Sequence, residues 1–265
     1  MTSRRLPHLG HTLLFLLLAV IAFVASEAVI LALFGRTHTL EALQNQRLQL
    51  AATTLTYLLT LLAARFIYPH IWSETFAQGI HWNLVKARAQ APKLIPLGLV
   101  LGFLLQAVES LITMPKSVPM EDYFKTPQMV WFLTFFGTLL APAFEEILFR
   151  GLLLPALAIA IDYMKLPKTP DSLETWRTST SFSPVALIIS SIITSLLFAA
   201  IHAPQLGYTW AAVALLACVS LLLCAIRLYT DSTAASTLVH AFYNLSVFIT
   251  LFVSTGGYRH LDKVS

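Results

Sequence analysis

Seven long runs of mainly apolar residues occupy most of this sequence. A helix needs roughly 17 to 25 such residues to cross the hydrocarbon core of a membrane. The runs cover residues 9–34, 48–68, 94–113, 129–163, 184–203, 208–229 and 233–253. They predict an all-α fold, a polytopic transmembrane helix bundle with about seven to eight spans.

The fourth run, 129–163, is too long for one straight crossing. We therefore expect its helix to tilt, to protrude from the membrane, or to break near Pro142, because proline disrupts a helix interior. A break there would create an eighth helical element.

The composition favours a membrane over water as the main solvent. Of 265 residues, 57% are hydrophobic and 11% are charged, whereas about 25% charged is usual in a soluble domain. The sequence contains no internal repeat, so residues 1–265 are predicted to form a single membrane domain. The net charge of +4 is small and the basic residues are scattered, which argues against nucleic-acid binding and leaves membrane lipid as a partner.

The Lys and Arg residues outside the centres of the apolar runs indicate an orientation. With seven spans, ten of them fall on the side of the amino terminus and six on the other, which favours a cytoplasmic amino terminus. The short, single-domain chain suits an integral, multi-pass protein of a bacterial inner (plasma) membrane.

The sequence also predicts the structure of two connecting segments. Residues 71–93 mix aromatic, apolar and basic residues, which fits either a helix lying at the membrane interface or a solvated loop. Residues 165–183 are rich in Pro, Thr and Ser, so we expect an extramembrane loop.

Glu145, Glu146 and Arg150 are charged residues near the middle of the fourth run. Ionisable groups deep in a membrane are costly, and they are usually paired, turned inward and functional. Glu146 and Arg150 are four residues apart on one helix face, which favours an ion pair. Glu145 points about 100° away from Glu146. One carboxylate is therefore predicted to be paired and the other to remain free for chemistry.

Two later runs carry polar residues at the same helical spacing. Phe198 precedes His202 by four residues, and His240 precedes Asn244 by four. Residues four apart project from one helix face. Convergence of the three runs would give a pocket with one free carboxylate, two imidazoles and an amide. However, His202 lies near the end of its run and His240 near the start of a run in the same direction, so convergence requires an extended or strongly tilted helix.

Such a pocket contains what hydrolysis of a peptide bond requires. A base activates water, a second group carries a proton to the leaving amine, and hydrogen-bond donors stabilise the oxyanion. His and Glu are also ordinary zinc ligands, so Glu145, His202 and His240 would bind a metal in a zinc-assisted version. The sequence leaves the zinc-assisted and the metal-free versions open.

The three motifs together resemble those of the CAAX-protease and bacteriocin-processing family of intramembrane proteases, of the CAAX prenyl protease 2 type. The resemblance covers residues 130–253. It implies an intramembrane endopeptidase, of metallo- or glutamate type, that acts on peptide or membrane-protein substrates. It also implies that Glu145 and His202 activate water, that His240 and Asn244 stabilise the oxyanion or help to bind a metal, and that Glu146, Arg150 and Phe198 support the site.

Other interpretations remain open at this level. Some members of that family act as scaffolds or regulators without proteolysis. A transporter or proton conduit would use Glu27, Glu109, Glu145 and the histidines as a relay. A haem protein would use His202 and His240 as ligands. Gly98 and Gly102 form a small-residue motif, for which helix packing is the plain explanation.

Overall fold

The computed structural model describes residues 6–113, except 35–44, and residues 124–263, except 180. The described residues form helices and no strands. The first half contains α1 (Leu9–Phe34), α3 (Gln46–Trp72), α4 (Phe76–Gly79) and α5 (Leu84–Glu109). The fourth crossing consists of α6 (Pro127–Phe135), η2 (Phe136–Leu140), α7 (Ala141–Glu146), η3 (Ile147–Leu153) and α8 (Leu154–Lys165). The chain continues with α9 (Pro170–Thr178), α10 (Pro184–His202), α11 (Trp210–Thr230), α12 (Thr233–Ser254) and the short η4 (Leu261–Lys263).

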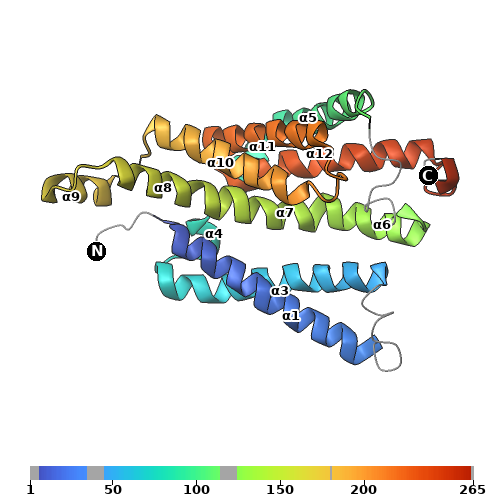
Figure 1. The fold of residues 1–265 in the computed structure, drawn as a ribbon, viewed down its shortest axis with the longest axis horizontal. Coiled ribbons are helices and arrows are strands. Elements are labelled where there is room, and N and C mark those ends of the chain that lie inside the picture. Colours follow the sequence, from blue (N-terminus) through green and yellow to red (C-terminus); the bar gives the residue numbers. More distant parts are fainter. Residues whose placement is uncertain (1–5, 35–44, 114–123, 180, 264–265) are drawn as a thin grey trace.

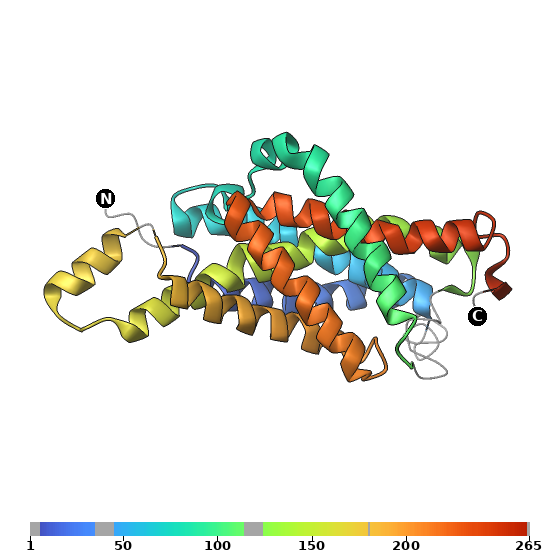
Figure 2. The same ribbon diagram turned by 90° about the horizontal axis from the view of Figure 1, so that it is seen from above.

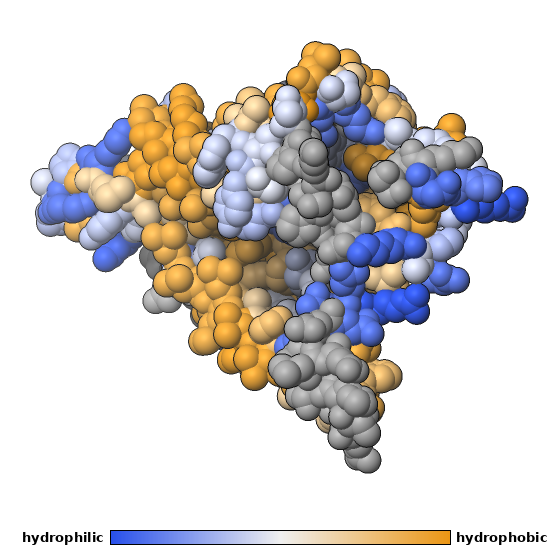
Figure 3. Space-filling view, turned by 45° about the vertical axis from the view of Figure 1, so that its right-hand side comes forward, coloured by the Kyte–Doolittle hydropathy of each residue, from blue (hydrophilic) through white to orange (hydrophobic). Residues whose placement is uncertain are grey.

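Seven helices of the described part are long and apolar enough to cross a membrane, which confirms the predicted bundle. The fourth crossing lies in the middle of the molecule, with α1 and α3 on one side and α5, α10, α11 and α12 on the other (Figure 1). A broad apolar surface separates hydrophilic ends (Figure 3), as lipid around the bundle and water at its ends require.

The helices begin where the sequence supplies capping residues. Asn45, Asn83, Ser183 and Ser232 each accept a hydrogen bond from the first turn of α3, α5, α10 and α12, respectively. Such caps satisfy backbone N–H groups that have no partner within the helix. Most boundaries therefore lie within a few residues of the apolar runs.

Both predictions for the connecting segments need correction. The segment 71–93 is neither one interfacial helix nor a plain loop, because α3 extends to Trp72, α4 is a single turn and α5 already begins at Leu84. The segment 165–183 contains the helix α9. Its first turn has Thr169 as a cap and Pro170 at the first helical position, two signals that outweigh the loop-like composition.

The fourth crossing remains continuous through Pro142 and contains no separate eighth element among its described residues. Instead, the helix widens into two π-helical segments, η2 directly before α7 and η3 directly after Glu146. A π turn admits one extra residue, which lets a helix pass a proline without breaking and often marks a functional site. The acidic pair thus lies on a short α-helical turn between two π segments.

Close packing of α5 against α12 fixes the helix that carries His240. A Cβ atom at Gly98 would lie 2.6 Å from the carbonyl oxygen of Val239, and one at Gly102 would lie 2.6 Å from that of Tyr243. Only glycine permits this approach, so the packing role of the two glycines is confirmed.

We expect Gly102→Ala to destabilise the protein strongly. The new Cβ would meet Ser246 Oγ at 2.0 Å as well as the backbone of α12, and overpacking of this kind costs ~1–3 kcal/mol. The measurement is the melting temperature of the purified protein in detergent. Gly10→Ala serves as the control, because the nearest atoms there belong to the His8 side chain, 3.2 Å away. Equal melting temperatures for the two variants would contradict this account of the α5–α12 contact.

Candidate active site

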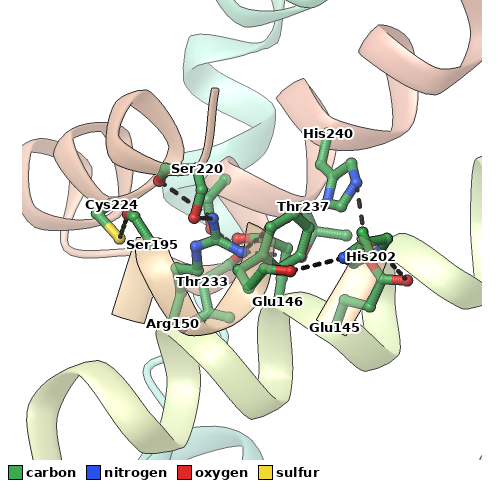
Figure 4. A network of polar contacts seen from close by, with 12 residues as sticks. Glu145, Glu146, Arg150, Ser195, His202, Ser220, Cys224, Thr233, Thr237 and His240 are labelled. Carbon is green, nitrogen blue, oxygen red and sulfur yellow. Dashed lines mark hydrogen bonds and ion pairs between the residues drawn. The ribbon is translucent and has the colours of Figure 1, made fainter. Parts of the chain in front are cut away.

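The two histidines converge on the free carboxylate of Glu145 from different helices (Figure 4). His202 Nε2 lies 4.0 Å from Glu145 Oε1, and His240 Nε2 lies 3.8 Å from Glu145 Oε2. The side chains of Glu145 and His202 are 18% and 17% exposed, whereas that of His240 is 5% exposed. The cluster is therefore buried on one side and accessible on the other.

The apparent mismatch in depth between His202 and His240 has a structural explanation. Along the long axis, α10 begins beyond the turn that joins α11 to α12, and α11 crosses the bundle obliquely (Figure 2). The end of α10 consequently reaches the level of the first turns of α12. The offset start of α10 thus brings His202 to the level of His240.

The ion pair predicted between Glu146 and Arg150 is present and fully buried. Arg150 Nη1 donates to Glu146 Oε1 at 2.9 Å, and neither side chain is exposed. The same oxygen lies 3.0 Å from His240 Nδ1. Glu146 Oε2 has no hydrogen-bond partner among the described residues. Glu146 therefore connects the arginine to one of the two histidines.

The residue that sequence reasoning missed is Ser220 on α11. Arg150 Nη2 donates to Ser220 Oγ at 2.7 Å and to the Ser220 carbonyl at 3.1 Å. A serine in an apolar helix gives no sequence signal of such a role, because small polar residues commonly bond their own helix. Ser220 of α11 thus positions Arg150, and Arg150 in turn pairs with Glu146.

Hydrogen bonds at Nδ1 determine how each imidazole presents its other nitrogen. The Phe198 carbonyl can only accept, so His202 Nδ1, 2.7 Å away, carries the hydrogen. An ionised Glu146 likewise accepts from His240 Nδ1. In its neutral form, each ring therefore directs an unprotonated Nε2 toward Glu145. An ionised Glu145 and two such nitrogens are all acceptors, so the space between them calls for a hydrogen-bond donor.

Phe198 packs at the centre of these groups. Its ring centroid lies 4.6 Å from that of His202 and 5.9 Å from that of His240. The Arg150 guanidinium carbon lies 4.7 Å from the same centroid, a distance typical of a cation–π contact. Phe198 forms a wall between the buried arginine and the two histidines.

Asn244 is held close to the acidic helix but by a different contact. Its Nδ2 donates to the carbonyl of Gly137 at 2.8 Å. Gly137 lies within the π segment η2, where the backbone hydrogen-bond pattern is altered. Within the described residues, Asn244 forms no hydrogen bond with Glu145, His202 or His240. The amide has a second hydrogen, which this contact does not use.

The side chains of Glu145, His202 and His240 lie slightly farther apart than the ligands of a bound zinc ion. Bonds of about 2.0–2.2 Å place the ligand atoms of a tetrahedral zinc ion about 3.4 Å apart, and the two histidine–Glu145 distances are longer, 3.8 and 4.0 Å. No group of three or more His, Cys, Asp or Glu side chains in the described part of the chain is placed to hold a metal ion. Zinc binding by Glu145, His202 and His240 therefore stays a prediction.

Comparison with known protein families gives a match that contains the whole cluster. Residues 127–246 match the Rce1-like family, described as type II CAAX prenyl endopeptidase Rce1-like. The match covers 120 of the 265 residues, slightly less than half of the chain. The matched region runs from the first residue of α6 into α12 and includes all three motifs, which confirms the resemblance seen in the sequence. Comparison with curated proteins and with solved structures gives no match.

Proposed function

We propose that this protein is an intramembrane endopeptidase that hydrolyses peptide or membrane-protein substrates. The observation that carries the proposal is the convergence of two imidazole Nε2 atoms on Glu145, at 4.0 and 3.8 Å. A compact cluster of this kind favours proteolysis over a conduit, which needs polar groups spread through the membrane. Glu27 and Glu109, the other acids considered for a conduit, lie on α1 and at the end of α5.

In the proposed mechanism, Glu145 and His202 activate one water molecule. A water that donates to two acceptors at about 2.8 Å spans about 4.4 Å between them, close to the 4.0 Å that separates Glu145 Oε1 from His202 Nε2. The water attacks the peptide carbonyl as its proton passes to the carboxylate or imidazole. The same proton then reaches the leaving amine.

His240 and Asn244 are proposed to stabilise the oxyanion. This role requires a hydrogen on His240 Nε2, so the ring acts as an imidazolium, which the Glu146 carboxylate at Nδ1 compensates. The second amide hydrogen of Asn244 is the other proposed donor. Glu146 and Arg150 position His240 without contact with the substrate.

The test is cleavage by the full chain reconstituted in liposomes. The substrates are peptides that end in a prenylated CAAX sequence and the same peptides without the prenyl group. We expect hydrolysis that incorporates one oxygen from labelled water into the new carboxyl terminus. A chain that folds and binds these peptides but cleaves none would contradict the proposal and favour a scaffold or regulator.

Chelation separates the metal-free mechanism from the zinc-assisted one. The geometry of the cluster supports the metal-free version, so we expect the initial rate to be unchanged after treatment with a strong zinc chelator. Loss of activity that returns on addition of zinc would contradict this expectation. That result would assign Glu145, His202 and His240 as ligands.

Ser220→Ala is expected to lower kcat while KM stays nearly constant. The variant removes one of the two acceptors for Arg150 Nη2, and hydrogen bonds to charged groups are worth ~1.5–3 kcal/mol. Ser220→Thr keeps the hydroxyl and should restore the rate. The control is Ser190→Ala, since Ser190 is equally buried but bonds its own helix. If both alanine variants cleave at the wild-type rate, Ser220 has no positioning role.

A further inference from the structure

A cavity of ≈ 510 Å³ lies at the end of the bundle that is formed by α4, the start of α10 and the end of α11. Its lining includes Arg150 and Arg227, together with His81, Asp231 and the exposed Glu74. None of the groups proposed to contact the substrate lines it. The cavity is therefore separate from the Glu145 cluster, although Arg150 borders both.

Arg227 is a buried cation whose guanidinium has more N–H donors than hydrogen-bond acceptors around it. A guanidinium has five N–H donors, and its side chain here is 7% exposed. Within the described residues, Arg227 has one hydrogen-bond acceptor, Asp231 Oδ1 at 3.3 Å, and its buried Nε has none. The buried Nε of Arg150 also lacks a partner. Two guanidinium groups with unused donors thus line the same space.

Asp231 is shared between Arg227 and two other basic side chains, those of His81 and Lys86. His81 Nδ1 lies 2.8 Å from Asp231 Oδ1, and Lys86 Nζ lies 3.0 Å from Oδ2. Partial burial acts to raise the pKa of Asp231, but the Lys86 hydrogen bond and the charges of His81 and Arg227 hold it below its ordinary value. Asp231 is thus an anion whose oxygens are already occupied, which leaves room for a second anion beside Arg227.

The position of the cavity and its apolar lining indicate which class of ligand it can bind. Arg227 is three residues from the end of α11, on the side that the sequence predicts to be the more basic one. Basic pockets between transmembrane helices at this level bind lipid headgroups. Phe182, Leu187 and Leu228 supply an apolar lining for the start of an acyl chain. Glu74 disfavours ligands with several negative charges, so a singly charged phosphodiester fits best.

We propose that this cavity binds the phosphodiester headgroup of a glycerophospholipid, with Arg227 as its main hydrogen-bond donor. The phosphate oxygens complete the hydrogen bonding of the guanidinium, and the glycerol and first methylenes lie against the apolar side chains. The site is independent of the proposed proteolysis. Its test therefore needs only the folded protein.

The experiment measures binding of three probes to the delipidated full chain in detergent by native mass spectrometry. The probes are dioctanoyl phosphatidylglycerol, inorganic phosphate and uncharged dioctanoylglycerol. The variants are Arg227→Gln, Leu187→Trp, which fills the cavity but keeps both arginines, and the control Arg88→Gln. Arg88 is an exposed basic residue of α5 that does not line the cavity.

We expect dioctanoyl phosphatidylglycerol to bind the wild type and Arg88→Gln equally, and to bind Arg227→Gln and Leu187→Trp at least tenfold more weakly. If Arg227→Gln fails to fold, weaker binding of the lipid by Leu187→Trp is the test of the proposal. The proposal would be overturned if all four proteins bound dioctanoyl phosphatidylglycerol equally. It would also be overturned if the wild type bound uncharged dioctanoylglycerol as tightly as dioctanoyl phosphatidylglycerol. Inorganic phosphate that binds as tightly as the lipid would also overturn it and assign the cavity to free phosphate.

Discussion

Glu145→Gln is expected to abolish peptide cleavage while the protein stays folded. Glutamine keeps the shape of the side chain but cannot take a proton from water, and general base catalysis contributes ~10²–10⁴-fold to a rate. Within the described residues Glu145 takes part in no hydrogen bond, so its replacement leaves no buried partner unsatisfied. The measurements are the initial rate in liposomes and the melting temperature in detergent.

Glu27→Gln provides the control for this prediction. Glu27 is another acid within an apolar helix, and it lies on α1, which carries none of the three motifs. We expect this variant to cleave at the wild-type rate. A Glu145→Gln protein that also cleaves at that rate would refute the proposed role of Glu145.

Arg150→Met is expected to cause the largest loss of stability among the site variants. It leaves the fully buried Glu146 carboxylate without its cation and frees the two acceptors on Ser220. Breaking one partner of a buried ion pair typically costs ~3–5 kcal/mol. The measurement is the yield of monodisperse protein after extraction, together with its melting temperature.

The double variant Glu146→Gln/Arg150→Met separates the charge effect from the packing effect. Glutamine removes the uncompensated charge and retains an oxygen that can accept from His240 Nδ1. We therefore expect the double variant to be more stable than Arg150→Met alone. If the double variant lost as much stability as the two single variants lose in sum, the ion pair would not determine the stability of this region.

The apolar runs alone were sufficient to predict most of the fold. Hydrophobicity determines where a chain crosses a membrane, so the predicted run 9–34 coincides with α1 and the run 184–203 differs from α10 by one residue. The third crossing begins ten residues before the predicted start at residue 94, because Asn83 caps a helix whose first turns are polar. Capping at Asn83 outweighed the hydropathy of those turns.

The sequence predicted the contact within one helix of the candidate site but not the contacts between helices. Spacing along one helix identified the Glu146–Arg150 pair, because that contact is local. The contact of Glu146 with His240 and that of Arg150 with Ser220 join different helices, and no spacing in the sequence encodes them. The π segments that flank the acidic pair were also not predictable, because they depend on how the continuous helix packs around Pro142.

The most direct test of a shared water molecule is the cleavage rate of the double variant Glu145→Gln/His202→Gln compared with those of the two single variants. Residues that act as one unit show strongly non-additive effects on kcat. We predict that each single variant loses nearly all activity and that the double variant is no slower than the slower single one. Losses that multiply in the double variant would contradict the account, because they would show that Glu145 and His202 act independently.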